Sequence, residues 1–261
     1  MFVNDKIITK KYDINRINGE KIRYYQLVLD NKIYNFPSIT TILSYMKDSK
    51  RVEDIKAELS TEVWEYVSDR GLSRGSVMHK YLENFLFKFY QTNDLNKSLY
   101  HTQLITPIDE EVNSIYEDKN KFFGLGRNLF YNFWHEGWFE KVKTVLFLEM
   151  YLFSMKYKFA GTSDYAYIDI NNKLIVGDFK SSTSKKTNED INKYKTQVSA
   201  YMEAFYEMFN IKPHYGEIVI SYDNDLDTFI VPFEERHEHL NDEFLTKSIL
   251  VNKKFENILN K

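Results

Sequence analysis

The chain has no cysteine among its 261 residues. This absence excludes disulfide bonds, thiolate-bound zinc, a cysteine nucleophile and an iron–sulfur cluster held by cysteines. Glycine and proline are also scarce, at nine and four residues. Because no flexible linker, repeat or low-complexity tract divides the chain, we expect a single domain over residues 1–261.

Long hydrophobic runs and an excess of positive charge are missing as well. No apolar stretch approaches the roughly 18 residues of a membrane span, and the first residues lack the apolar core of a signal peptide. We therefore expect a cytoplasmic protein with no membrane partner. Lys and Arg number 35 against 38 Asp and Glu, a net charge of −3. This balance argues against a protein that coats duplex DNA, while a local basic groove remains open.

The hydrophobic pattern predicts an α/β protein with a mixed central sheet flanked by helices. Residues 1–140 form a mainly helical front half with a short N-terminal hairpin, and residues 141–261 hold a β-meander, a helix, two strands and a closing helix. In the front half we expect strands at Lys21–Leu29 and Lys32–Phe36, helices at Pro37–Tyr45, Arg51–Asp69, Ser73–Tyr90 and Asp109–Gly137, and a loop at Gln91–Pro107. In the second half we expect strands at Lys143–Leu152, Tyr157–Ile170, Leu174–Lys180, Tyr215–Tyr222 and Thr228–Phe233, and helices at Asp190–Phe209 and Glu234–Leu259.

An acidic and a basic residue close one of these apolar strands. Asp178 follows the run Leu174–Gly177, and Lys180 shares its face because side chains alternate along a strand. A carboxylate beside a cation at a strand end suits a metal ligand with a charged neighbour. Taken alone, the same pattern is typical of a solvated surface pair.

The loop between two predicted strands decides whether Asp178 meets a second carboxylate, Asp164. A two-residue loop at Asn171-Asn172 sets Asp164 opposite Phe179, on the wrong face. A three-residue loop, residues 170–172, sets Asp164 opposite Asp178. Two facing carboxylates repel each other, and a bound Mg²⁺ would relieve the repulsion.

Two predicted helices carry further polar residues. His79 borders the apolar stripe of the Ser73–Tyr90 helix, where a core histidine is the common alternative to a metal ligand. Gly75, one turn earlier, weakens that helix, which a close approach of another group would explain. Gln197 and Tyr201 form an i, i+4 pair on a later helix and also fit a half-buried packing face.

Taken together, these motifs resemble the PD-(D/E)XK nuclease superfamily, specifically its RecB-like exonuclease branch. The resemblance rests on the order of the motifs: Arg74-Gly75-Ser76-Val77-Met78-His79, Glu149, Gly161-Thr162-Ser163-Asp164, Asp178-Phe179-Lys180-Ser181-Ser182, and Gln197 with Tyr201. The segment Pro37-Ser38-Ile39-Thr40-Thr41-Ile42-Leu43 also resembles the mitochondrial genome maintenance exonucleases and their phage relatives.

The resemblance implies a Mg²⁺- or Mn²⁺-dependent DNA exonuclease, acting on single-stranded ends in replication, recombination or repair, in the cytoplasm of a bacterium or a phage-infected host. The metal ligands it implies are His79, Asp164, Asp178 and the Phe179 carbonyl. It gives Lys180 a catalytic role, Glu149 a nearby acidic role, and Gln197 and Tyr201 a place lining the site. Two departures stand out. Asp178 replaces the longer Glu of many members, and the four-cysteine iron–sulfur cluster of many relatives is excluded.

Substrate contacts are expected from Ser38, Arg70, Arg74, Lys185 and Lys186, although the two lysines also fit a solvated loop. Two alternatives share the fold: a structure-selective endonuclease, and a catalytically inactive DNA-binding or assembly protein. Replication or recombination proteins are further expected partners.

Overall fold

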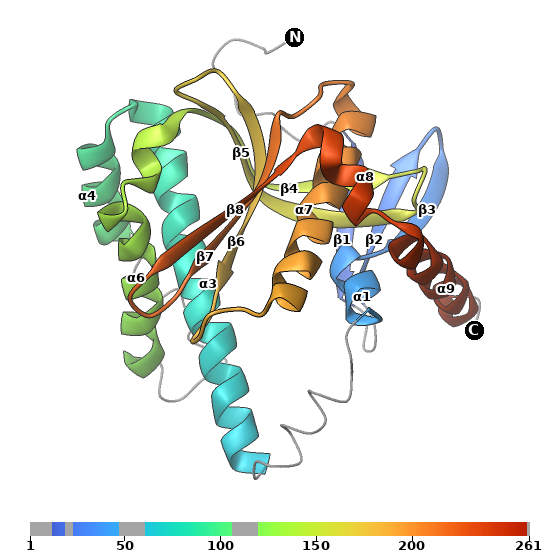
Figure 1. Ribbon diagram of the computed structural model, residues 1–261, viewed down its shortest axis with the longest axis horizontal. Helices are drawn as coiled ribbons and strands as arrows, with labels where there is room; N and C mark the ends of the chain where they lie inside the picture. The colour runs from blue at the N-terminus through green and yellow to red at the C-terminus, as the bar shows by residue number, and fades with distance from the viewer. Residues whose placement is uncertain (1–11, 19–22, 47–60, 106–119, 260–261) are drawn as a thin grey trace.

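The computed structural model describes residues 12–18, 23–46, 61–105 and 120–259. Its centre is a five-stranded sheet in the order β4-β5-β6-β7-β8 (Figure 1). The strands are β4 (Val142–Ser154), β5 (Phe159–Asp169), β6 (Leu174–Ser181), β7 (Tyr215–Ser221) and β8 (Leu226–Pro232). β6 and β7 pair in parallel and the other neighbours pair antiparallel, so the sheet is mixed. The α/β fold class predicted from the sequence is confirmed.

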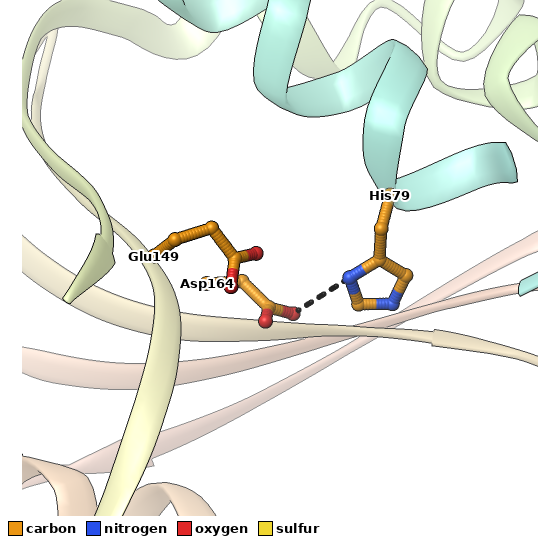
Figure 2. A group of neighbouring side chains, drawn as sticks. All are labelled: His79, Glu149 and Asp164. Atoms are coloured by element: carbon orange, nitrogen blue, oxygen red, sulfur yellow. Dashed lines mark ion pairs between the residues drawn. The ribbon is translucent and has the colours of Figure 1, made fainter. Parts of the chain in front are cut away.

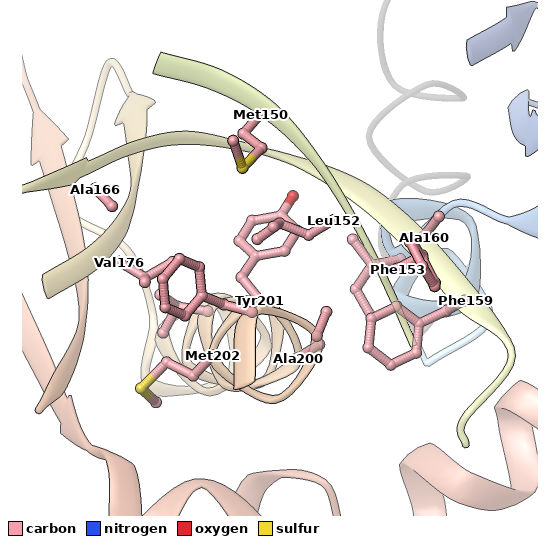
Figure 3. Close-up of a cluster of buried hydrophobic side chains, with 14 of the residues drawn as sticks. Met150, Leu152, Phe153, Phe159, Ala160, Ala166, Val176, Ala200, Tyr201 and Met202 are labelled. Atoms are coloured by element: carbon pink, nitrogen blue, oxygen red, sulfur yellow. The ribbon is translucent and has the colours of Figure 1, made fainter. Parts of the chain in front are cut away.

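Helices cover both faces of this sheet. On one face, α7 (Asn188–Phe209) places Tyr201, Met202 and Phe205 in a core with β4, β5 and β6 (Figure 3). On the other face, α3 (Thr61–Thr92) and α6 (Asn120–His135) enclose a second core rich in aromatic rings. Alternation along β6 divides its side chains between the two cores, since Val176 lies in the first and Phe179 in the second. Side chains of one strand therefore face either α7 or α3, depending on the face of the sheet on which they lie.

A second, three-stranded sheet packs beside β5 (Figure 1). It consists of β1 (Asp13–Asn18), β2 (Arg23–Leu29) and β3 (Lys32–Pro37). Asp30 and Asn31 join β2 to β3 with φ of 50° and 59°, as a tight two-residue hairpin turn requires. Ser38 then begins α1 (Ile39–Ser44) by accepting the Thr41 amide at 3.0 Å. The predicted N-terminal hairpin is therefore confirmed, and β1 extends it.

Three predictions of the elements were wrong. The separate helices expected at Arg51–Asp69 and Ser73–Tyr90 join into one helix, α3, which is continuous from Thr61 to Thr92. The expected loop at Gln91–Pro107 contains α4 (Leu95–Ile105), because Asp94 accepts the Lys97 amide at 3.0 Å and starts a new helix. The expected closing helix breaks into η2 (Phe233–Glu235), α8 (Arg236–His239) and α9 (Asp242–Leu259). At this second break the Asn241 side chain accepts the Phe244 amide at 3.2 Å and begins α9.

Part of the expected helical structure, residues 51–60 and 109–119, lies outside the described residues. A short 3₁₀ turn, η1 (Trp138–Lys141), leads from α6 into β4. None of the described helices combines the length and apolar character that crossing a membrane requires. The single-domain organisation stays a prediction.

Candidate metal centre

The ladder between β5 and β6 ends at the pair Tyr165 and Gly177. The Asp169 amide donates to the Lys173 carbonyl at 2.9 Å, so the hairpin loop holds residues 170–172. The three-residue alternative is therefore the correct one, and Asp164 and Asp178 occupy the next positions past the last pair. There the Asp164 Oδ2 accepts the Phe179 amide at 2.6 Å, in place of a main-chain ladder bond. The two strands diverge at a pair of carboxylates.

Asp178 is held by groups from β6 and α7. Its side chain is 5% exposed and forms an ion pair with Lys180. The Gln197 Nε2 donates to the Asp178 Oδ1 at 3.2 Å and to the Tyr201 hydroxyl at 2.8 Å. The i, i+4 spacing sets the two side chains next to each other on α7, and Gln197 contacts the carboxylate directly. Lys180 also lies 5.6 Å from the centre of the Tyr194 ring.

His79 comes to the same place from α3. Its Nδ1 lies 3.5 Å from the Asp164 Oδ2 (Figure 2). The imidazole also interacts with the main chain of Phe179 and meets that residue's ring edge-on, at 6.1 Å between centroids. A Cβ on Gly75 would lie 2.9 Å from the Ser181 Oγ, so glycine there lets α3 approach the end of β6. The close approach expected from the sequence is present.

Glu149 completes a compact group with His79 and Asp164 (Figure 2). One ligand atom from each residue lies within 4.8 Å of the others. The pairs Leu148–Tyr165 and Met150–Ser163 leave Glu149 across the ladder from Asp164. Its φ is +47°, a left-handed conformation that is costly for a residue other than glycine inside a strand. Strain of this kind persists where the surrounding structure enforces it.

Burial raises the pKa of the three carboxyl groups, Glu149, Asp164 and Asp178. It is the main cause that raises the pKa of both Asp164 and Asp178 to about 6, against the opposing effect of the Lys180 charge. Partial desolvation, reinforced by the Asp164 carboxyl, raises the pKa of Glu149 to about 8 although its side chain reaches solvent. These carboxyl groups therefore resist ionisation in the metal-free protein.

The pKa values of the two basic side chains, His79 and Lys180, shift in opposite directions. Burial lowers the pKa of His79 to about 4, so its imidazole is neutral near pH 7 and keeps a nitrogen lone pair. For Lys180, burial acts to lower the pKa, but Asp178 and Asp164 outweigh it and the net pKa is raised. Lys180 is therefore an ammonium in the metal-free protein.

These groups line a cavity of about 180 Å³. Its walls come from β1, β2, α1, α3, β4, β5, β6 and α7, and hold Arg16, Arg23, Tyr25, Ser38, Ile39, Thr40, His79, Glu149, Gly161, Thr162, Asp164, Asp178, Lys180, Gln197 and Tyr201. Sequence reasoning missed Arg16 and Arg23. β1 lacks regular alternation, because its apolar residues Ile14 and Ile17 are three positions apart, and nothing in its sequence indicates where the arginines lie.

The expected substrate-contact residues are not brought together. Ser38 lines the cavity, but it is 1% exposed and caps α1. Arg74 is 1% exposed and its Nη1 donates to Asp223 at 2.7 Å, which gives it a structural contact instead of a place in the cavity. Lys185 pairs with aspartates at the end of the β7–β8 hairpin. Neither Arg70 nor Lys186 is part of the cavity lining, and their contacts with substrate stay predictions.

The donor set fits a divalent metal ion. Carboxylate oxygens suit hard cations such as Mg²⁺ and Mn²⁺, and a neutral imidazole is a better ligand for Mn²⁺ and other transition metals than for Mg²⁺. Three carboxyl groups, two of them largely buried, line this cavity together with Lys180, Arg16 and Arg23, and a bound cation would offset the repulsion between the carboxylates. The tight group contains Glu149, whereas the Asp178 carboxylate is turned to Lys180 and Gln197.

Comparisons with known proteins give no family for this chain. No family model matches it, and no curated protein matches it. Among solved structures, it is similar to SSO0001, with 18% identity, a TM-score of 0.31 and 54% of this chain covered. It is also similar to a protein from Eubacterium rectale described as "Putative exonuclease", with 13% identity, a TM-score of 0.39 and 71% of this chain covered. The matches span 65% and 66% of those two chains, just under two thirds of their length.

Proposed function

We propose that this protein is a divalent-metal-dependent nuclease that hydrolyses phosphodiester bonds in DNA, and that it acts as an exonuclease on single-stranded ends. The observation that carries the proposal is the meeting of His79, Asp164, Asp178 and Lys180 at one cavity. These residues come from segments far apart in the chain, and they are the ones that the PD-(D/E)XK resemblance assigns to metal binding and catalysis.

In this proposal His79, Asp164 and Glu149 hold Mg²⁺ or Mn²⁺, with Asp178 and the Phe179 carbonyl beside them. Such an ion, when bound, lowers the pKa of a coordinated water and stabilises negative charge on phosphoryl oxygens. The compact geometry of the first three residues and the neutral state of the imidazole support this assignment.

The remaining residues have separate roles. Lys180 supplies a buried positive charge next to Asp178, suited to stabilise the charge that develops on the phosphoryl group as water adds to phosphorus and the ester bond breaks. Gln197 is a positioning residue, because its amide fixes the Asp178 oxygen that does not face Lys180. Tyr201 in turn fixes the Gln197 amide.

The size of the site supports the proposed preference for single strands. The cavity is small and is lined by residues of both sheets, α1, α3 and α7, so a flexible strand enters it more readily than a stiff duplex. The net charge of −3 gives little general attraction for duplex DNA. Binding must then depend on local contacts near the cavity.

Linear and circular single-stranded DNA of one sequence, compared in Mn²⁺ with linear duplex as a third substrate, test the proposal. We expect rapid loss of the linear strand, an intact circle and slow loss of the duplex. Equal rates on line and circle would replace the exonuclease with an endonuclease. Binding without cleavage in Mg²⁺ and Mn²⁺ would instead favour the inactive DNA-binding alternative.

A further inference from the structure

The N-terminal sheet places two arginines, Arg16 and Arg23, in the wall of the cavity. In the β1–β2 ladder Ile14 pairs with Leu27 and Arg16 pairs with Tyr25. Since residues two apart share a face, Arg16 and Arg23 lie on the same face as these apolar side chains. Ile14, Tyr25 and Leu27 are buried there, and the two arginines continue that face beyond the core.

The backbone that carries the arginines is fixed to the metal-centre strands. The Tyr25 hydroxyl lies 2.9 Å from the Thr162 Oγ1, two residues before Asp164 on β5. The Arg23 carbonyl accepts the Ser38 amide at 3.4 Å, and Ser38 bridges to Ala160 on the same strand. The arginines are therefore presented by a rigid support rather than by a loop.

Their charges are available for a ligand. Both side chains are exposed, and within the described ranges no carboxylate lies at ion-pairing distance from either guanidinium, although Glu149, Asp164 and Asp178 line the same cavity. Two guanidinium groups facing one space suit an anion that can accept several hydrogen bonds, and phosphate oxygens match their planar donor geometry.

We propose that Arg16 and Arg23 form a phosphate-anchoring site that holds the backbone of a nucleic-acid strand next to the phosphodiester that is cleaved. The proposal rests on the proposed nuclease function, which it deepens by naming the residues that receive the strand. The chemistry suits either a terminal phosphate monoester or an internal diester.

Binding of a fluorescent single-stranded oligonucleotide in EDTA, where no cleavage occurs, tests the anchoring site. The variants are Arg16→Gln, Arg23→Gln and the double variant, and the matched control is Arg127→Gln, an exposed arginine on α6 outside the cavity lining. We expect each single change to weaken binding by about tenfold. The slope of log affinity against log salt should also become shallower by roughly 0.7 for each phosphate of a single strand that the variant no longer neutralises. Arg127→Gln should alter neither quantity.

Two further experiments distinguish a terminal phosphate from an internal diester, and a role in binding from a role in catalysis. If the ligand is a terminal phosphate, removing the 5′-phosphate or the 3′-phosphate from the oligonucleotide should weaken binding as much as the double variant does. If it is an internal diester, end chemistry should have no effect and only the variants should bind weakly; both results support the site. In Mn²⁺, the Arg16→Gln and Arg23→Gln substitutions should raise KM far more than they lower kcat. Arg16→Lys and Arg23→Lys should restore part of the affinity.

Wild-type affinity and salt slope in a folded double variant would overturn the anchoring site. That result would leave the nuclease proposal standing, provided that the wild-type protein cleaves DNA in Mn²⁺. Conversely, a wild-type protein that never cleaves DNA would overturn the nuclease proposal, while the binding arms in EDTA would still decide whether the arginines hold a strand.

Discussion

Asp164 and Asp178 are the first residues past the last pair of the β5–β6 ladder, and both have a raised pKa of about 6 because they are buried. Their positions follow from a hairpin loop of three residues, 170–172. The left-handed φ of +59° at Asn172 lets the chain close that loop. Ionising both carboxyl groups is unfavourable when no metal ion is bound. The stability of the metal-free protein therefore depends on pH.

The first prediction concerns pH. A carboxyl whose pKa is higher in the folded state than in the unfolded state destabilises the fold as pH rises from its unfolded pKa to its folded pKa. For Asp178 this range runs from 3.8 to about 6. Asp178→Asn should therefore match wild type at pH 4 and exceed its free energy of unfolding at pH 8 by on the order of 2 kcal/mol. Urea unfolding in EDTA at both pH values measures this difference, and an advantage that is larger at pH 4 would contradict it.

The second prediction separates charge from hydrogen bonding at Asp164. Asp164→Asn removes the charge and retains an oxygen that can accept the Phe179 amide, so the metal-free stability should hold or rise. Asp164→Ala leaves that amide without its acceptor, which costs about 1–3 kcal/mol. Both variants should lose cleavage. Equal stabilities of the two variants in urea unfolding would show that the Phe179 contact contributes nothing.

The third prediction concerns strain at Glu149. Glycine accepts a φ of +47° without steric cost, so Glu149→Gly should stabilise the metal-free protein by about 1 kcal/mol. The same change removes a metal ligand, so Mn²⁺ should raise the melting temperature less than in wild type. Lys158→Gly is the control, because Lys158 has a φ of +53° and lies outside the cavity. It should gain the same stability and keep the full response to Mn²⁺. A normal Mn²⁺ response in Glu149→Gly would remove Glu149 from the metal centre.

The fourth prediction concerns the positioning role of Gln197. Gln197→Ala leaves the Asp178 Oδ1 without its amide donor, and such outer contacts change metal affinity by roughly 10–100-fold. The Mn²⁺ concentration that gives half-maximal cleavage should rise accordingly, while saturating Mn²⁺ restores much of the rate. Tyr201→Phe retains the ring and should have a smaller effect. A purely structural role for Gln197 would lower the melting temperature without moving the Mn²⁺ dependence.

The fifth prediction concerns Gly177, the residue before Asp178. A Cβ there would lie 2.1–2.3 Å from ring atoms of Tyr165, which is buried at 1% exposure. Gly177→Ala should therefore cost about 1–3 kcal/mol by overpacking. Gly71→Ala, on a part of α3 with open space around it, should instead gain about 0.5–1 kcal/mol. Chemical unfolding of the two variants measures both effects, and a neutral Gly177→Ala would show that the Tyr165 ring can move aside.

The sequence predicted the sheet and α7, and alternation and helical spacing place Asp178 with Lys180 and Gln197 with Tyr201. The grouping of His79 and Glu149 with them came from the PD-(D/E)XK resemblance and not from a local pattern. It left the hairpin loop undecided, since Asn171-Asn172 fits a loop of either length. Three features depend on distant contacts that no local pattern encodes: the left-handed backbone of Glu149, the burial of Arg74 against Asp223, and the position of β1 beside the cavity.

Metal-dependent cleavage by the cavity residues is tested most directly with 5′-labelled linear single-stranded DNA and two proteins, wild type and Asp178→Asn, each in Mn²⁺, Mg²⁺ or EDTA. Circular dichroism establishes that both proteins are folded, and binding in EDTA establishes that both hold the strand. We expect wild type to shorten the DNA with either metal and not in EDTA, and Asp178→Asn to bind the strand without shortening it. Cleavage by wild type that persists in EDTA, or cleavage by Asp178→Asn at the wild-type rate, would contradict the proposed metal centre.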